Sequence, residues 1–367
     1  MQPKFAAMLI KIDKYILRNF LLTFVFLLII FSAIAIVFDY TEKMKDFVKR
    51  KPAGIEVLHY FANFLPYILA LLFPIFIFVA VILFTSRLAN RSEIIAILNT
   101  GMTFKRFLRP YFLGAAIICS VLLLANHYII PKANKKRLQF EEKYIWEHLY
   151  EGSHNEMHIR ISPTEYIYLQ SYNPDTKTGF HFTYEKIEGT LLKEKWMADK
   201  CVYDSIRKGW KLSDIVIQRN DTLKESLEKV KDQFKKMAFV PEDLVVRREG
   251  KQMMTSPQLN AHLRKEEAKG SENLSEYYIE KYRRTASPFS AFILSIIGAC
   301  LASKKVRGGS GVHVAIGLMI SAVYIFMMQF TTTFAIKGNL HPMIAVWLPN
   351  VLFSFVAYAI YRQRIKV

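Results

Sequence analysis

Long apolar runs occupy both ends of the chain, whereas residues 131–285 mix polar and apolar positions. A run of about 18–20 apolar residues crosses the hydrocarbon core of a bilayer, roughly 30 Å thick, as a helix. Six runs are long enough, and none carries an Asp, Glu, Lys or Arg beyond its first turn. They predict transmembrane helices at Tyr15–Phe38, Leu58–Thr85, Phe107–Ile130, Ala286–Ser303, Val312–Ile336 and Met343–Tyr361. Pro66 and Pro74 lack amide donors and predict a bend in the second helix rather than a gate.

The polar middle of the chain has strand patterns between helical flanks. Alternating segments and segments rich in β-branched or aromatic residues predict strands at 158–161, 166–169, 180–184, 210–212 and 214–217. Helical patterns flank them at 132–150, 256–270 and 272–284. Strands without intervening helices predict an antiparallel sandwich or open barrel. The predicted fold class is a helical membrane protein with an inserted β-rich domain, divided into residues 1–130, 131–285 and 286–367.

Residues 86–109, between the second and third spans, contain a short amphipathic segment. Its apolar positions are Ala89, Ile94, Ile95, Ile97 and Leu98, and its polar positions are Arg87, Asn90, Arg91 and Glu93. Asn99, Thr100 and Gly101 supply residues typical of a helix end. The segment predicts a helix over residues 87–100 that is too short to span a membrane.

Lys and Arg are distributed unevenly over the short segments between the spans. The N-terminus, the loops after spans two and four, and the C-terminal tail hold fifteen, whereas the other two short loops hold six. Cytoplasmic loops carry the excess of Lys and Arg. We therefore expect both termini in the cytoplasm and residues 131–285 outside it. Membrane topology also explains most of the formal charge of +19, without nucleic-acid binding.

No catalytic or metal-binding constellation stands out. No glycine-rich loop has the lysine and following Ser or Thr that bind nucleotide phosphates. His154 and His158 have no evident third ligand, and the three cysteines define no disulfide framework. The sequence therefore predicts a protein that is not itself an enzyme and holds no metal or cofactor.

Three motifs carry a resemblance to a known family. They are Leu9–Ile16 (LIKIDKYI), Asn90–Ala96 (NRSEIIA) followed by Gly101–Thr103 (GMT), and Arg284–Pro288 (RTASP). With three spans on each side of a domain of about 150 residues, they resemble the lipopolysaccharide-export permease family, the LptF/LptG pair. The resemblance covers essentially the whole chain, is most specific in the second motif, and is to the Bacteroidetes branch.

This resemblance implies a transport subunit. It implies an inner-membrane heterodimer with a paralogous six-span permease, bound to an LptB-like ATPase dimer that holds the ATP. It further implies that a jellyroll-like periplasmic domain passes lipopolysaccharide to an LptC-like, single-span bridge protein. ATP binding would close the cavity between the permeases and expel the lipid upward.

The residues of the second motif are the candidates for coupling to the ATPase: Asn90, Arg91, Ser92 and Glu93. Glu93 and Asp13 are the only acidic residues in the predicted cytoplasmic segments. A carboxylate on an exposed helix can accept charge-assisted hydrogen bonds from a partner's Arg or Lys, and in the family the matching position docks into the ATPase. Alternatively, Glu93 offsets Arg91 and Arg87 on a solvated face.

A basic cluster follows the first span on the predicted periplasmic side, against the usual charge bias. Its members are Lys43, Lys45, Lys49, Arg50 and Lys51. Basic groups there can hold the phosphates of lipid A, and in the family such residues contact the lipid. Alternatively, the loop pairs with its own acidic residues or with ordinary headgroups.

Two other functions fit the same sequence less well. Another ATP-driven lipid or lipoprotein permease would usually have four spans with the large domain after the first. A membrane-anchored receptor or enzyme would need fewer spans, and residues 131–285 show no catalytic set.

Overall fold

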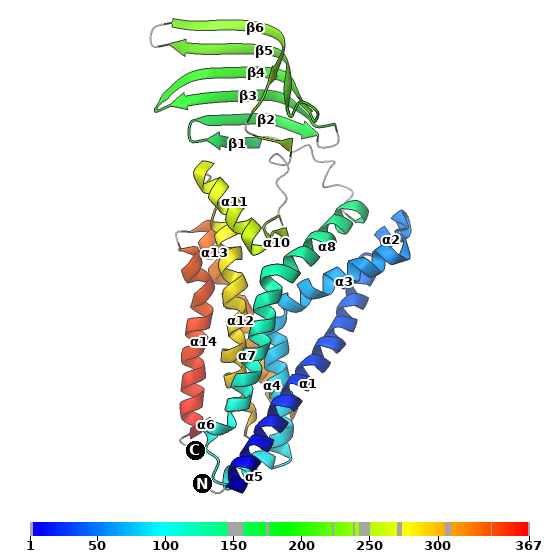
Figure 1. Cartoon of the computed structure of the whole chain (residues 1–367), viewed down its shortest axis with the longest axis vertical. Coiled ribbons are helices and arrows are strands. Elements are labelled where there is room, and N and C mark those ends of the chain that lie inside the picture. The colour runs from blue at the N-terminus through cyan, green and yellow to red at the C-terminus, as the bar shows by residue number, and fades with distance from the viewer. Residues whose placement is uncertain are drawn as a thin grey trace. The chain divides into compact units, whose positions relative to one another are not determined.

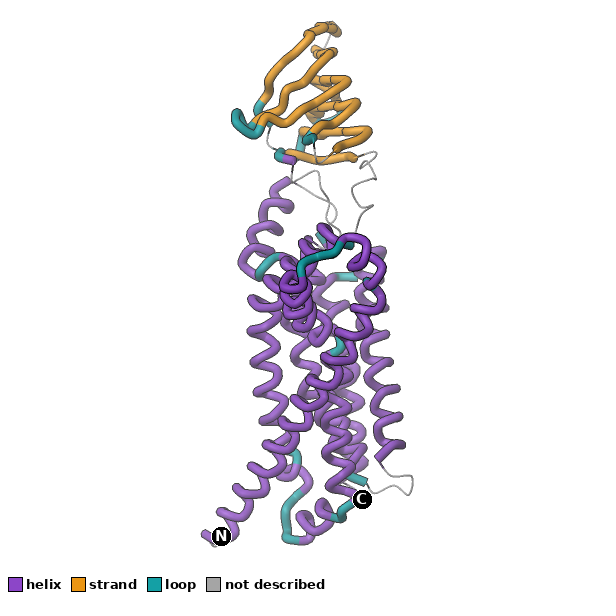
Figure 2. The backbone as a smooth tube through the Cα atoms, turned by 90° about the vertical axis from the view of Figure 1, so that its right-hand side faces the viewer, coloured by secondary structure: helices purple, strands orange, loops and turns teal. Residues whose placement is uncertain are grey.

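The computed structural model describes residues 3–145, 157–173, 176–221, 224–237, 239–241, 250–269, 274–304, 310–338 and 340–365. The chain divides into two compact units (Figures 1 and 2). The helical unit comprises Met1–Gln139, Gln252–Ser256 and Ser275–Val367, and the β unit comprises Phe140–Lys251 and Pro257–Leu274.

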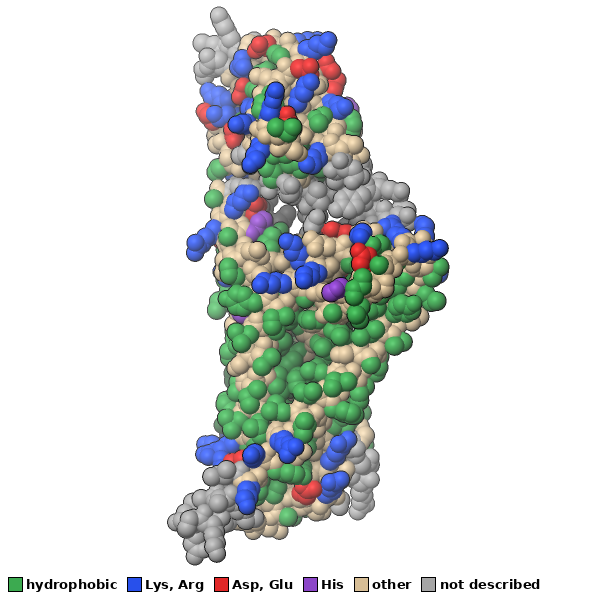
Figure 3. Space-filling model, turned by 45° about the vertical axis from the view of Figure 1, so that its right-hand side comes forward, with side chains coloured by type: hydrophobic (Ala, Val, Ile, Leu, Met, Phe, Trp, Pro, Cys, Tyr) green, Lys and Arg blue, Asp and Glu red, His purple; other side chains and the backbone are tan. Residues whose placement is uncertain are grey.

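Long helices dominate the helical unit. Its elements are α1 (Pro3–Glu42), α2 (Met44–Arg50), α3 (Gly54–Leu71), α4 (Phe73–Asn90), α5 (Glu93–Asn99), α6 (Phe104–Phe107), α7 (Arg109–Leu124), the π-helical η1 (Ala125–Ile129), α8 (Ile130–Tyr144), α12 (Ser275–Ala302), α13 (Ser310–Lys337) and α14 (Pro342–Ile365). Among the described residues, seven helices are long and apolar enough to cross a membrane. Figure 3 shows the broad apolar band that they form, with Lys and Arg at its margins.

The second predicted span, Leu58–Thr85, is two helices rather than one, and the bend predicted from its prolines is found at Pro74 as a break between them. The chain breaks at Leu72, two residues before Pro74, because Pro74 lacks the amide that would donate to the carbonyl of Ala70 and therefore lies in the first turn of α4. Pro66, by contrast, lies inside α3. Figure 1 shows α3 leaving the direction of α4 at a sharp bend, and together they make one passage from α2 to α5. Seven apolar helices therefore make six passages.

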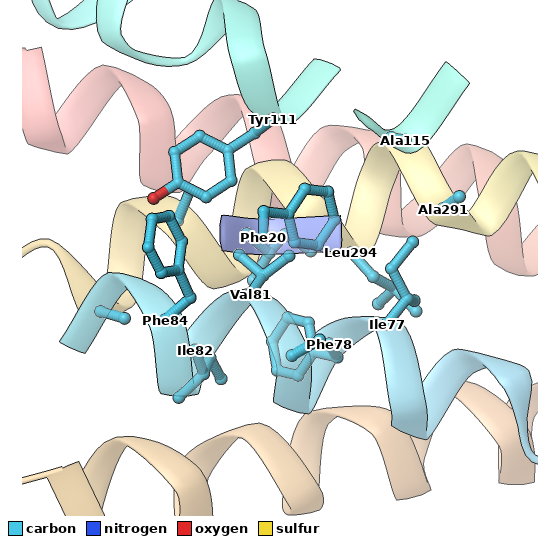
Figure 4. Packing of buried hydrophobic residues seen from close by; sticks show 14 of the residues in the cluster. Phe20, Ile77, Phe78, Val81, Ile82, Phe84, Tyr111, Ala115, Ala291 and Leu294 are labelled. Carbon is cyan, nitrogen blue, oxygen red and sulfur yellow. The ribbon is translucent and has the colours of Figure 1, made fainter. Parts of the chain in front are cut away.

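The core of the helical unit surrounds α4. Of its residues, 78% are buried, against 17% for α3, and it packs on α1, α12 and α13. Figure 4 shows Phe78 and Val81 of α4 among the buried side chains. Glycines permit this close approach: a Cβ on Gly298 would lie 3.0 Å from Val81 Cγ1, and one on Gly317 would lie 2.4 Å from Ile82 Cδ1.

The fourth predicted span and the helix predicted before it form one continuous helix, α12. Pro288 lies inside α12 and cannot donate to the carbonyl of Arg284, four residues earlier. The side chain of Asn126, in η1, donates to that carbonyl instead, with Nδ2 and O 3.0 Å apart. A side chain from another helix thus restores the hydrogen bond that the proline removes.

The β unit contains a six-stranded antiparallel sheet with its described strands in sequential order, a meander. The strands are β1 (Met157–Ser162), β2 (Glu165–Asn173), β3 (Thr178–Glu188), β4 (Leu191–Asp204), β5 (Gly209–Asp221) and β6 (Lys224–Lys235). Two short helices follow the sheet in the chain: α10 (Gly250–Met253), which the division of the units cuts after Lys251, and α11 (Ser256–Lys269), which lies in the β unit from Pro257 on. The predicted inserted β-rich domain is confirmed, while β4 and β6 were not predicted.

The sheet bends along one line that crosses four strands. Leu169, Phe182, Ala198 and Ile215 form one row of neighbours, and Tyr172, Gly179, Cys201 and Leu212 form the next. Both rows are buried, although the two members on each strand are three residues apart. In a regular strand such residues face opposite sides. His181 and Asp214, with φ of 50° and 54°, lie between the rows and mark the bend.

Candidate coupling and lipid-binding sites

The predicted coupling segment lies at the end of the helical unit that carries both chain termini, which we call the terminal end (Figure 1). Asn90 is the last residue of α4, and Ser92 has left-handed backbone geometry with φ 58° and ψ 13°. The amide of Ser92 donates to the carbonyl of Ala89 at 3.0 Å. The chain therefore turns sharply, and the predicted helix over 87–100 is shortened to α5.

Ile94 fixes α5 to the rest of the unit. This side chain is 1% exposed and belongs to the main apolar core, whereas Ile95 beside it is 55% exposed. Because α5 has only seven residues, it cannot be stable by itself and depends on this contact. α5 is consequently a short helix that is held by the buried side chain of Ile94 and exposes its other face, which includes Ile95.

Glu93 begins α5, where a negative charge favours the helix N-terminus. Its side chain is 31% exposed and accepts a hydrogen bond from Tyr15 Oη of α1, at 3.3 Å. Arg91 Nη1 lies 3.9 Å from Glu93 Oε1, and its side chain is 74% exposed. The Glu93 carboxylate therefore makes two long polar contacts, with Tyr15 and Arg91, and one side of it is open to solvent.

At the opposite end of the helical unit, the structure separates Lys43 from the other members of the predicted lipid-binding cluster. Lys43 Nζ lies 2.7 Å from Asp39 Oδ1 and hydrogen-bonds to Tyr60 Oη, and the Tyr60 hydroxyl donates to Asp39 Oδ2 at 2.9 Å. The ammonium also lies over the rings of Tyr60 and Phe64. Lys43 is thus an internal brace between α1 and α3.

The remaining basic residues of the cluster lie on or just after α2. Lys45, Lys49 and Lys51 are exposed, and Arg50 is half-buried. Phe47 fastens α2 to α1 through a ring contact with Tyr40, with centroids 5.6 Å apart. Met44 and Val48 are 51% and 64% exposed on the same short helix. α2 therefore presents basic and apolar side chains together, as interfacial helices do.

A polar cluster near the same end was not predicted from the sequence. Glu280 Oε1 accepts from Arg284 Nε at 3.0 Å, and Glu280 Oε2 accepts from Arg283 Nη2 at 2.5 Å. Arg284 also reaches Ser256 Oγ at 3.3 Å, which lies 2.6 Å from His127 Nδ1. The cluster borders a cavity of about 130 Å³ between α3, η1, α12 and α13. The polar cluster thus connects η1, Ser256 and α12, the segments that lie before and after the β unit in the chain.

The histidine pair considered as metal ligands gains no support as a pair. His158 lies on β1 with its ring centroid 4.7 Å from that of Tyr168. His154 lies outside the described residues.

The apolar helices and the β-rich insertion between α8 and α12 define a multi-pass membrane protein with a large extramembrane domain. The sequence model of the family described as "Lipopolysaccharide export system permease LptF/LptG" matches residues 14–363. The chain belongs to this family, and it is accordingly an inner-membrane permease of lipopolysaccharide export. No curated protein matches the chain. The family predicted from the three motifs is confirmed.

Proposed function

We propose that this chain is the permease subunit of an ABC transporter that extracts lipopolysaccharide from the inner membrane and passes it to a periplasmic bridge protein. Its partners would be an LptB-like ATPase dimer, a paralogous permease and an LptC-like bridge. Both termini would face the cytoplasm, residues 131–285 would be periplasmic, and ATP would be bound by the ATPase alone.

One observation carries the proposal: α5 places an accessible carboxylate beside an exposed isoleucine at the terminal end. Glu93 has an open side, and Ile95, on the same short helix, is 55% exposed. A groove on a partner that supplies an Arg or Lys and an apolar wall would satisfy both side chains. The ATPase dimer is the partner that the family implies for this end.

A movement of α5 would reach the core through α4. Ile94 is buried in the same core as Phe78 and Val81 of α4. Gly298 of α12 and Gly317 of α13 let these helices pack directly against α4, so that no free space separates them. Closure of the ATPase dimer on ATP would therefore displace α4 together with the helices that pack on it, and so change the shape of the lipid cavity.

The structure changes which residues we propose as contacts of lipid A. Lys43 braces α1 against α3 through Asp39 and Tyr60, so we assign the phosphate contacts to Lys45, Lys49, Arg50 and Lys51. These residues lie on or just after the amphipathic helix α2, and basic side chains at a membrane surface attract lipid phosphates.

The coupling role is tested with Glu93→Gln, which removes the charge and keeps the size and the acceptor for Tyr15. One charge-assisted hydrogen bond contributes about 1.5–3 kcal/mol, so we expect roughly 10- to 100-fold weaker association with the ATPase. Glu42→Gln, on an exposed residue at the opposite end, is the matched control. Co-purified ATPase and lipopolysaccharide export are measured at equal permease level. Wild-type values for both in Glu93→Gln would remove the assignment.

A further inference from the structure

A groove of about 760 Å³ opens at the terminal end, between α7, α12 and α14. Its volume lies within the range of ligand-binding pockets, about 300–1,000 Å³. The groove involves neither α5 nor α2, so it is separate from both candidate sites described above. Its walls come from helices of the membrane-spanning region, and its rim comes from the chain around α6.

The rim of the groove is basic. Lys105, Arg106 and Arg109 border it, and none of the described residues that line it is acidic. Arg106 forms an ion pair with Asp13 of α1, which leaves its charge engaged. Lys105 and Arg109 are exposed, and no acidic side chain in the described part of the chain pairs with either. Two positive charges therefore face the opening of the groove without internal compensation.

The floor of the groove is apolar and aromatic. Phe112 of α7 and Phe292 of α12 lie with ring centroids 4.9 Å apart, and Ile293 and Ile296 continue the same surface along α12. Phe112 and Leu113 are each 53% exposed. Within a bilayer, such a surface suits a hydrocarbon chain.

The length of the groove matches the depth of a headgroup and the start of an acyl chain. Tyr361 and Ser354 of α14 both line it, and seven residues of helix span about 10 Å. Each headgroup region of a bilayer is roughly 5–8 Å thick. Tyr358 and Tyr361 stand on this wall, and aromatic residues of this kind mark the membrane–water interface. Arg362 lies over the Tyr358 ring at 5.8 Å and adds a third cation nearby.

We propose that this groove binds an anionic glycerophospholipid, with the headgroup phosphate at Lys105 and Arg109 and one acyl chain along Phe112 and Phe292. The positive rim selects a negative headgroup, and the uncharged floor selects the chain rather than a polar ligand. The site would hold a lipid of the surrounding membrane in place between α7, α12 and α14, apart from the transported lipid.

The proposal is tested by native mass spectrometry of the full-length protein, with its co-purifying subunits, after delipidation in mild detergent. Phosphatidylglycerol and phosphatidylethanolamine of equal chain length are titrated separately. We expect phosphatidylglycerol to bind more tightly, and Lys105→Gln with Arg109→Gln to weaken it roughly 30-fold, since each basic residue near an anionic lipid contributes about fivefold. Leu113→Trp, which narrows the groove and keeps every charge, should weaken both lipids.

Arg18→Gln with Arg87→Gln is the matched control, because both residues are exposed at the terminal end and lie away from the groove. Its phosphatidylglycerol affinity should equal that of the wild type. An equal loss in this control would show that only surface charge matters and would overturn the proposal. Equal binding of the two lipids, unchanged binding in the Lys105 and Arg109 variant, or a lipopolysaccharide or a polypeptide helix in the groove instead would overturn it as well.

Discussion

Asn126→Ala tests how the helical unit tolerates a proline inside α12. The Asn126 side chain donates to the Arg284 carbonyl at 3.0 Å, the carbonyl that Pro288 leaves without its helical donor. A buried carbonyl left without a donor costs about 1–3 kcal/mol, and few alternative donors exist in a bilayer. We therefore expect Asn126→Ala to lower the free energy of unfolding in detergent micelles by about 1–3 kcal/mol.

A double-mutant cycle separates this hydrogen bond from a general packing loss. Pro288→Ala returns an amide hydrogen to the helix, so Asn126→Ala should cost at least about 0.5 kcal/mol less in that background. Asn63→Ala is the matched control, because the Asn63 amide donates at 2.6 Å to a carbonyl of its own helix, His59, and is exposed. Reversible denaturation by SDS measures all five proteins. Equal costs of Asn126→Ala in both backgrounds would show that Asn126 does not replace the donor that Pro288 removes.

Two further predictions concern a thiol and a buried ion pair. Burial raises the pKa of the Cys201 thiol to about 12, so at pH 8 only about one molecule in 10,000 carries the reactive thiolate. With Cys119 and Cys300 replaced by alanine, maleimide should label Cys201 only on unfolding, and fast labelling of the folded protein would contradict this. Asp39→Ala leaves Lys43 without its carboxylate and should cost about 3 kcal/mol, most of it recovered by adding Lys43→Met. An Asp39→Ala cost below about 0.5 kcal/mol, in the same SDS titration, would show that the pair is no brace.

Hydrophobic periodicity predicted the helical unit well because long apolar runs have few alternatives in a bilayer. It did not locate the break between α3 and α4, since the run from Leu58 to Thr85 stays apolar throughout. Pro66 and Pro74 predicted a bend in this run, but not which of them ends a helix: Pro66 lies inside α3, whereas Pro74 lies in the first turn of α4, a favoured position for proline. Hydrophobic periodicity also predicted two helices where the structure has α12 alone. The polar residues before Ala286 were assigned to a separate helix of the extramembrane domain.

In the β unit, a bend inside one strand and a strongly charged strand obscure the alternating pattern of apolar residues. β5 was predicted as two segments, 210–212 and 214–217, because its apolar positions change phase between Leu212 and Ile215. The structure has one strand, bent at Asp214, with both phases facing the same core. β6 was missed because its sequence, KESLEKVKDQFK, is dominated by charged residues. Its pairing partner β5 lies next to it in the chain and sets its register instead.

Of the candidate sites, the segment proposed for coupling could be delimited from the sequence because its residues are contiguous and lie at one turn; their role in coupling stays a prediction. It could not distinguish Lys43 from its neighbours, because its partner Tyr60 is seventeen residues away. The polar cluster of Glu280, Arg284 and His127 could not be predicted from the sequence either, because its contacts join segments up to 129 residues apart. Charge and spacing predict such sites only where the fold keeps neighbours in sequence together.

The composition of the complex that the chain forms decides between the proposed transporter and the alternatives. The tagged protein is purified gently from its native membrane, and every copurifying protein and lipid is identified by mass spectrometry. We predict an ATP-binding subunit, a second six-span permease of the same family, and lipopolysaccharide. Recovery of the chain alone, under conditions that keep other ABC complexes intact, would contradict the proposed transporter.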